Sequence, residues 1–244
     1  MRFCLLIVGV VSISVFISGC ASAPGRPLPK DLPIVPGDIS DFKVLYGQNC
    51  AGCHGSEGKG GAAIALADPV YLAIADDTVL RRAATNGIPG TSMPAFAQSA
   101  GGMLTDNQID LIANGIRERW SQPDVFRGAD PPPYSSSRPG DSTRGSQVYA
   151  TYCSSCHGVD GRGAKKASSI VDGSFLGLIN DQELRTIVIA GRPELGAPDW
   201  RSDVPGKPMS QQDVSDVVAW VASQRPRFPG QPYPSVPKAT GEVR

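Results

Sequence analysis

The chain contains the stretch Cys50-Ala-Gly-Cys53-His54-Gly55 and, further along, a second version of it, Cys153-Ser-Ser-Cys156-His157-Gly158. A tyrosine stands four residues before each copy, and a short glycine-rich run follows each one. Corresponding residues of the two copies lie 103 positions apart. Because self-similarity at a fixed spacing is typical of repeated units, the sequence predicts two copies of one domain.

Both histidines of the chain and four of its six cysteines belong to these two motifs. Cys-x-x-Cys-His is the pattern of covalent haem attachment. Two thiols three residues apart lie on one side of a helical turn, where they match the two vinyl groups of a porphyrin, and the next histidine reaches the iron. The alternatives are disulfides or one zinc site shared by both cysteine pairs. Zinc takes four ligands, however, which would leave the two histidines unexplained.

We therefore predict two covalently attached haem c groups, one in each copy. The residues predicted to form the thioether bonds are Cys50, Cys53, Cys153 and Cys156. The residues predicted to bind the two irons are His54 and His157.

The composition is typical of small, loop-rich domains organised around a cofactor. Of 244 residues, 28 are glycine and 22 are proline, and aromatic residues make up only 7%. Small domains with few large side chains need additional core material, which a haem supplies. Basic and acidic residues number 23 each. The chain therefore lacks the excess of positive charge on which nucleic-acid binding depends, and we expect no nucleic-acid partner.

The N-terminus has the pattern of an export signal. The apolar run from Phe3 to Ile17 is shorter than the ~20 residues of a membrane span and fits a signal-peptide core. It ends in Ile17-Ser-Gly-Cys20, which resembles the bacterial lipobox. This predicts a signal peptide over 1–19, a lipid-modified Cys20 as the mature N-terminus, and a proline-rich tether over 20–37. The alternatives are an ordinary cleaved signal or an uncleaved anchor, with Cys20 incidental.

Apolar residues at helical spacing predict helices and no strands, hence an all-α fold. Helices are expected over 39–50, 76–86, 105–120, 180–190 and from 210 onward. The order of helix, haem motif, loop, middle helix, loop and terminal helix resembles the class I cytochrome c fold. The resemblance implies two tandem domains, each with a few helices around a covalent haem. Their expected bounds are 38–120 and 142–225, with a Pro/Ser-rich linker at 121–141 and a Pro-rich tail at 226–244.

In class I cytochromes c a methionine is usually the second axial ligand of the iron. The segment Gly90-Thr-Ser-Met93-Pro94-Ala-Phe96 resembles the family's methionine segment, which implies that Met93 binds the first iron. Met103 is the competing candidate, but it lies directly before the terminal helix without a following proline.

The second copy departs from this pattern, because Ala197 stands where the methionine is expected. The methionine that follows in this copy is Met209. Two interpretations remain open. Met209 binds the second iron from a longer loop, or that iron is five-coordinate or holds water or a weak ligand, and Met209 belongs to the core or the surface.

These features predict an electron carrier rather than an enzyme. We expect a membrane-tethered dihaem cytochrome c on the periplasmic side of a bacterial cell envelope, lipid-anchored to the membrane. Its partners would be a redox protein donor and acceptor, or a larger respiratory or dehydrogenase complex. The alternative is a haem enzyme or gas-binding protein, for example peroxidase-like, that uses an open coordination site at the second haem. Glu194 and Asp199 flank Ala197 as candidate acid or base groups for such chemistry.

Overall fold

The computed structural model describes residue 27 and residues 32–226. The predicted signal peptide, the lipid site Cys20 and the tail from residue 227 lie outside the described residues. The chain divides into two compact units, one ending at Asp38 and the other beginning at Ile39. Within the first unit, the described residues include the short 3-10 helix η3 (Pro36–Asp38).

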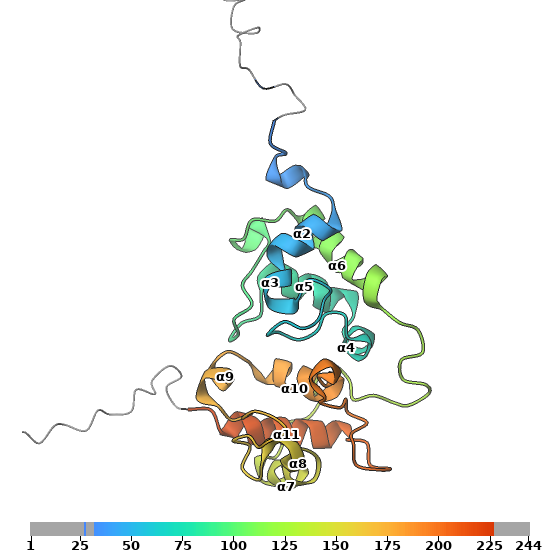
Figure 1. Ribbon diagram of the computed structural model, residues 1–244, viewed down its shortest axis with the longest axis vertical. Coiled ribbons are helices and arrows are strands. Elements are labelled where there is room, and N and C mark those ends of the chain that lie inside the picture. The colour runs from blue at the N-terminus through green and yellow to red at the C-terminus, as the bar shows by residue number, and fades with distance from the viewer. Residues whose placement is uncertain (1–26, 28–31, 227–244) are drawn as a thin grey trace, which may run out of the picture. The chain divides into compact units, whose positions relative to one another are not determined.

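The described residues from Ile39 onward form helices joined by loops, with isolated β-bridges and no β-strand, which confirms the predicted all-α class. The first copy contains α2 (Phe42–Asn49), α3 (Ala51–His54), α4 (Pro69–Ile74), α5 (Asp77–Asn86), η4 (Gln98–Ala100) and α6 (Asp106–Trp120). The second copy contains α7 (Ser142–Tyr152), α8 (Ser154–His157), α9 (Gly173–Gly177), α10 (Asp181–Ala190), η5 (Pro193–Leu195) and α11 (Gln211–Ser223) (Figure 1). Among these helices, none is long and apolar enough to span a bilayer.

Side-chain caps explain where the longer helices begin. The Thr105 hydroxyl accepts a hydrogen bond from the Gln108 backbone N–H, and the Gln108 side chain accepts one from the Thr105 N–H, so α6 starts with a capping box. Ser210 and Asp213 form the same device at the start of α11. Helix α4 was not among the predicted helices, although Asp68 caps it and Pro69 occupies its first position, which is a common pattern for a helix start.

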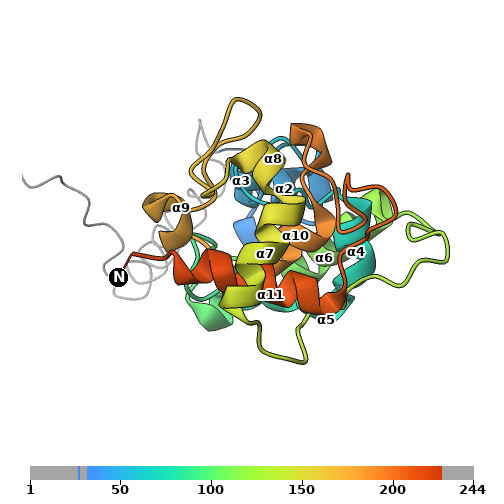
Figure 2. The same cartoon turned by 90° about the horizontal axis from the view of Figure 1, so that it is seen from below.

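In each copy the first and last helices cross at close range. In the first copy the small residue at the crossing belongs to the last helix, and in the second copy it belongs to the first helix. In the first copy the Phe42 ring of α2 lies against Gly115 of α6, where an added Cβ would be 2.1 Å from the ring. In the second copy the small residue is Gly145 of α7, against the α11 backbone at Asp216 and the Trp220 side chain. Figure 2 shows α7 crossing α11. A large residue on one helix is thus matched by a glycine on the other, which keeps the two helices in contact.

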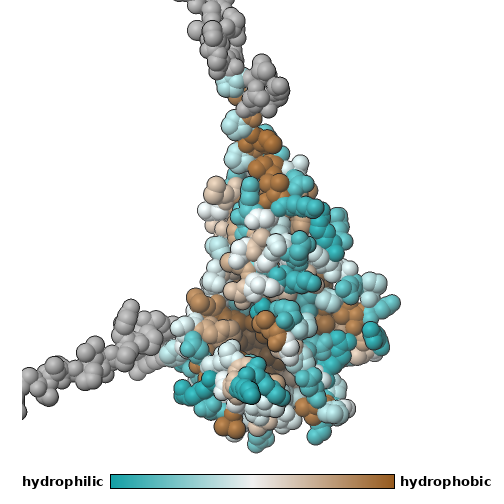
Figure 3. Space-filling view, in the orientation of Figure 1, coloured by the Kyte–Doolittle hydropathy of each residue, from teal (hydrophilic) through white to brown (hydrophobic). Residues whose placement is uncertain are grey.

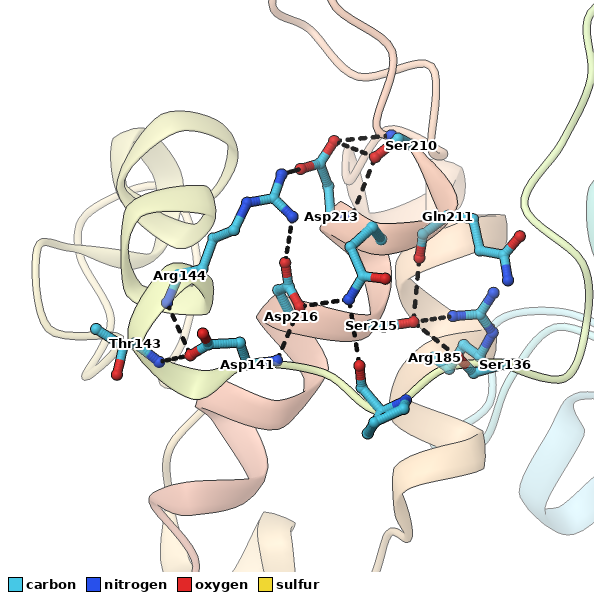
Figure 4. Close-up of polar contacts among 12 residues, drawn as sticks. Ser136, Asp141, Thr143, Arg144, Arg185, Ser210, Gln211, Asp213, Ser215 and Asp216 are labelled. Atoms are coloured by element: carbon cyan, nitrogen blue, oxygen red, sulfur yellow. Dashed lines mark hydrogen bonds and ion pairs between the residues drawn. The ribbon is translucent and has the colours of Figure 1, made fainter.

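The linker between the copies is bound along its second half to the second copy. The buried Arg185 of α10 donates hydrogen bonds to the carbonyl oxygens of Pro133 and Tyr134 at 2.9–3.1 Å. Next to it, the Ser136 hydroxyl lies 2.8 Å from that of Ser215 in α11 (Figure 4). The segment 133–136 is therefore held by hydrogen bonds against α10 and α11 of the second copy.

The two copies also pack directly on each other. One hydrophobic cluster contains buried residues of both, including Tyr71 of α4 and Ile189 of α10. The Asn180 side-chain amide of the second copy donates a hydrogen bond to the Pro89 carbonyl of the first, at 2.9 Å. A shared core of this kind holds the two motifs in one fixed arrangement.

Candidate functional site

The two Cys-x-x-Cys-His motifs form the same structure. Helix α2 ends at Asn49, with Cys50 as its C-cap, and the one-turn helix α3 follows. The Cys53 and His54 backbone N–H groups donate to the Cys50 carbonyl at 3.2 and 3.0 Å. After α7, the Cys156 and His157 N–H groups donate to Cys153 at 3.1 and 2.9 Å. Each motif therefore places two thiols and an imidazole on a single tight turn.

None of the four cysteines in the described part of the chain forms a disulfide. Burial raises the pKa of the Cys50 thiol to about 12 and that of the Cys153 thiol to about 11. These thiols are therefore protonated at neutral pH and are not the activated thiolates of a cysteine nucleophile. The described residues also contain no cluster of three or more His, Cys, Asp or Glu side chains suited to a metal ion.

Each motif histidine is oriented by a backbone carbonyl. His54 Nδ1 lies 2.8 Å from the Ile64 carbonyl oxygen, and His157 Nδ1 lies 2.8 Å from that of Ser168. A carbonyl can only accept, so Nδ1 carries a proton in both rings, and the neutral form of each ring has its lone pair on Nε2, where a metal can bind. Burial lowers the pKa of His54, the Ile64 carbonyl opposes this shift, and the Arg192 guanidinium adds to it. The neutral, ligating form of His54 is therefore favoured.

A tyrosine and a glycine support each turn, a role that the sequence analysis did not assign. The Tyr46 hydroxyl donates to the Gly55 carbonyl at 2.9 Å, and Tyr149 donates to Gly158 in the same way. Gly55 has a φ of +83°, and an added Cβ would lie 1.8 Å from the Lys59 carbonyl oxygen. Only glycine fits this backbone. The repeated tyrosine and the glycine after each histidine were the available signals.

The two methionine candidates of the first copy lie in different environments. Met93 is half-buried, and its carbonyl accepts a hydrogen bond from the Ile88 N–H at 3.1 Å. Met103 is 81% exposed on the surface. An axial ligand has to reach a haem held inside the domain, so the exposure of Met103 favours Met93.

The backbone places Ala197 where Met93 lies in the first copy. The Arg192 N–H donates to the Ala197 carbonyl at 3.0 Å, which repeats the bond from Ile88 to Met93. The helix before each bond ends at a glycine of positive φ, Gly87 or Gly191. The second copy therefore has a methyl group where the first has a thioether.

Met209 has the position of a core residue. Its N–H donates to the Trp200 carbonyl at 2.8 Å, as the Leu104 N–H does to the Phe96 carbonyl, also at 2.8 Å. Met209 is 5% exposed and Leu104 is 6% exposed, and each directly precedes the cap of the last helix. Met209 also borders a cavity of about 450 Å³ under the linker prolines 131–133. These contacts favour the interpretation of Met209 as a packing residue.

The residues fit a covalent haem in each copy. The thiols are unpaired, the histidines present a free Nε2, and the buried Trp200 indole N–H has no hydrogen-bond partner among the described residues. Buried N–H groups are nearly always paired, and a haem carboxylate could supply the missing acceptor. A separate cavity of about 560 Å³ lies at Gly90 and the α9–α10 connection and includes no motif residue. Figure 3 shows a hollow with hydrophobic residues in the region where Figure 1 shows α9 and α10.

Known proteins resemble both copies. Residues 37–114 match the family model of cytochrome c oxidase, cbb3-type, subunit III, and residues 142–225 match that of cytochrome c. A cbb3-type cytochrome c oxidase subunit CcoP of Azospirillum sp. is 27% identical over 65% of this chain and 51% of its own length. A cytochrome bc1 complex cytochrome c subunit of Mycobacterium leprae is 25% identical over 73% of this chain and 62% of its own length.

The chain thus spans about half to three fifths of the length of these relatives. Among solved structures, a chain of the Kuenenia stuttgartiensis reducing HAO-like protein complex is 19% identical, with a TM-score of 0.44, over 80% of this chain and 100% of its own. That similarity is too low to support a conclusion. The two family matches, the helical fold and the repeated motif together show that this chain contains two tandem class I cytochrome c domains, a family whose cofactor is haem c.

Proposed function

We propose that the chain is a dihaem electron-transfer protein in which each domain carries one covalently attached haem c. The observation that supports this most directly is the duplicated turn, with each histidine Nδ1 held 2.8 Å from a carbonyl. Cys50 and Cys53 hold the first haem and His54 binds its iron. The corresponding residues of the second domain are Cys153, Cys156 and His157. A bound haem c supplies a one-electron Fe(III)/Fe(II) couple.

The chain's own residues keep both centres rigid. The histidines are held by carbonyls, the turns by the tyrosine hydroxyls, and the two domains by a shared core. Electron transfer needs no acid, base or substrate pocket, only a site that changes little between two oxidation states. The cytochrome subunits of oxidase and bc1 complexes that the chain resembles support this role over that of an enzyme.

The attachment residues can be tested by counting haems. The wild-type chain, denatured to release any non-covalent haem, is expected to keep two haems. A Cys50→Ser/Cys53→Ser variant should keep one, and a Cys153→Ser/Cys156→Ser variant should keep the other. The measurement is haem absorbance per chain on the denatured protein. Two covalent haems retained in either double variant would contradict the assignment.

Met93 is proposed as the second ligand of the first iron, and Ala197 leaves the second iron without a thioether. Thioether ligation raises the reduction potential, so we expect two separate potentials and two different spectra. Met93→Ala should abolish the sulfur-to-iron charge-transfer band. Met209→Ala should leave both spectra unchanged if Met209 only packs as Leu104 does. Two indistinguishable low-spin His/Met spectra in the wild type would refute this asymmetry.

A second candidate function follows from Ala197, namely binding of a small neutral ligand such as carbon monoxide at the second iron. The two acids that flank Ala197 are occupied, since Glu194 pairs with Arg192 and Asp199 pairs with Arg201. This arrangement favours ligand binding over peroxidase-like acid–base chemistry. Carbon monoxide should change the spectrum of one reduced haem per chain, and peroxide consumption should stay at the level of free haem. If the spectrum of the reduced protein does not change when carbon monoxide is added, this second candidate function is excluded.

We further propose that Cys20 carries a lipid that tethers the protein to the membrane on the periplasmic side, where it exchanges electrons with a respiratory complex. The support is the lipobox-like sequence that ends at Cys20 and the respiratory complexes named for the relatives. In bacterial cells, Cys20→Ser should move the haem-containing protein from the membrane fraction to the soluble fraction, with Cys4→Ser as the matched control. Wild-type protein recovered in the soluble fraction would argue against the tether.

A further inference from the structure

The segment from Gly61 to Ile64 holds the first motif in place. Gly61 lies so close to the motif that an added Cβ would be 2.1 Å from the Cys53 carbonyl oxygen. The Ala63 N–H donates to that same carbonyl at 2.9 Å, and the Ile64 carbonyl accepts the His54 Nδ1 proton at 2.8 Å. Any contact on this segment therefore acts on the surroundings of His54.

Arg192 of the second domain makes such a contact. Its Nη2 donates to the Gly61 carbonyl at 3.0 Å, and its Nε pairs with Glu194 Oε1 at 2.5 Å. The side chain of Arg192 is 14% exposed and that of Glu194 is 20% exposed. Because the Arg192 side chain is mostly buried, its charge is screened less than that of a fully exposed side chain.

The second domain's own motif has a different environment. The segment that carries its histidine-binding carbonyl, 163–168, includes the exposed lysines Lys165 and Lys166. Arg162, just before it, pairs with Asp160, and these side chains are 80% and 56% exposed. The charges near His157 are thus solvated, whereas the charge near His54 comes from the other domain and is largely shielded from water.

We propose that Arg192 is the residue through which the second domain sets the redox potential of the first haem. This rests on the proposed attachment of that haem to Cys50, Cys53 and His54. Oxidation removes one electron from the centre and adds one positive charge, which a nearby guanidinium disfavours. Arg192 therefore raises the potential, and Glu194 partly offsets it.

The position of Arg192 also connects the two centres. Its backbone N–H and carbonyl pair with the carbonyl and N–H of Ala197, both at 3.0 Å. The short hairpin that pairs Arg192 with Ala197 therefore reaches both domains. Ala197 is the counterpart of Met93 in the second domain, and the Arg192 side chain contacts Gly61 next to the first motif.

The test is a spectroelectrochemical titration of the full-length, haem-loaded protein, with the first haem followed by the sulfur-to-iron band that depends on Met93. Arg192→Gln should lower the potential of the first haem, and Glu194→Gln should raise it. Arg192→Lys, which keeps the charge, should stay closer to the wild type than Arg192→Gln. Arg162→Gln, which removes an equal but solvated charge, is the matched control and should leave the first haem unchanged.

Shifts of opposite sign in the potential of the first haem for Arg192→Gln and Glu194→Gln would support an effect of charge. A loosened loop would instead move this potential in the same direction in both variants. Shifts of the same sign, or unchanged potentials in both, would overturn the proposal. The haem count and the wild-type band are measured first. Wild-type protein without two haems or without the band would contradict the proposed function itself. Failure of the proposed function is thereby distinguished from failure of the proposal on Arg192.

Discussion

The glycine at the crossing of α7 and α11 allows a quantitative test of how the second domain is held together. In Gly145→Ala, the added Cβ would lie 2.0 Å from the Asp216 carbonyl oxygen and 2.8 Å from the Trp220 Cβ. Ordinary contact begins at 3.4 Å, so the two helices would have to separate by about 1.4 Å. The obstacle is backbone, which cannot rotate away as a side chain can. Overpacking of this kind costs about 1–3 kcal/mol, and the size of this overlap points to the upper end.

Gly47→Ala in α2 is the matched control. Gly47 is also inside a helix, but nothing lies within 4 Å of its added Cβ. Alanine favours a helix over glycine by about 1 kcal/mol, and this gain is common to both variants. It cancels in their difference, which therefore measures the steric cost of about 3 kcal/mol at the crossing.

The assay is thermal unfolding of the haem-loaded protein, followed by far-ultraviolet circular dichroism. For a chain of this size, 1 kcal/mol corresponds to about 2–4 °C in Tm. Gly145→Ala should therefore melt about 6–12 °C below Gly47→Ala, and Gly47→Ala should melt at or slightly above the wild type. Equal melting temperatures for the two variants would show that the crossing tolerates a methyl group and would refute the argument.

Three other substitutions test separate parts of the structure. Ala197→Met puts a thioether at the counterpart of Met93 and should raise the potential of the second haem and abolish carbon monoxide binding; an unchanged titration curve would mean that position 197 does not face the iron. Asp216→Ala removes the buried carboxylate that accepts the Asp141 N–H at 2.8 Å and should cost about 1–3 kcal/mol in urea unfolding, whereas a loss below the error of that measurement would contradict this. Burial raises the pKa of Glu183, so its ionised form opposes folding above the ordinary value of 4.5. Glu183→Gln should therefore raise Tm at neutral pH, with a gain that fades as the pH falls towards 4.5 and is absent below it; a gain independent of pH would exclude ionisation as the cause.

Much of the candidate site could be predicted because it is local. A motif of five consecutive residues places its thiols and imidazole within one helical turn, and residues three and four apart in a helix always face the same side. The same locality explains why the helices expected over 39–50, 76–86, 105–120, 180–190 and from 210 onward match the structure. The short helix α4 was missed because its six residues contain too little periodicity to be recognised.

Other features could not be predicted, because they depend on contacts between distant residues. The sequence left two interpretations of Met209 open. The structure favours one of them, since its bond to Trp200 repeats that of Leu104 to Phe96. The composition of 121–141 predicted a linker, but it could not indicate that a buried arginine on α10 binds the carbonyls of that segment.

The sequence by itself determined that there are two domains, that each has one Cys-x-x-Cys-His turn, and that the second lacks the methionine of the first. Covalent attachment chemistry and helical periodicity are short-range properties, so they can be read from neighbouring residues. Only the tertiary structure decided which carbonyl orients each histidine, and that Arg192 contacts Gly61 across 131 positions of the chain. Such contacts arise when separate helices bury their apolar faces together, and no local pattern encodes which loops that packing brings into contact.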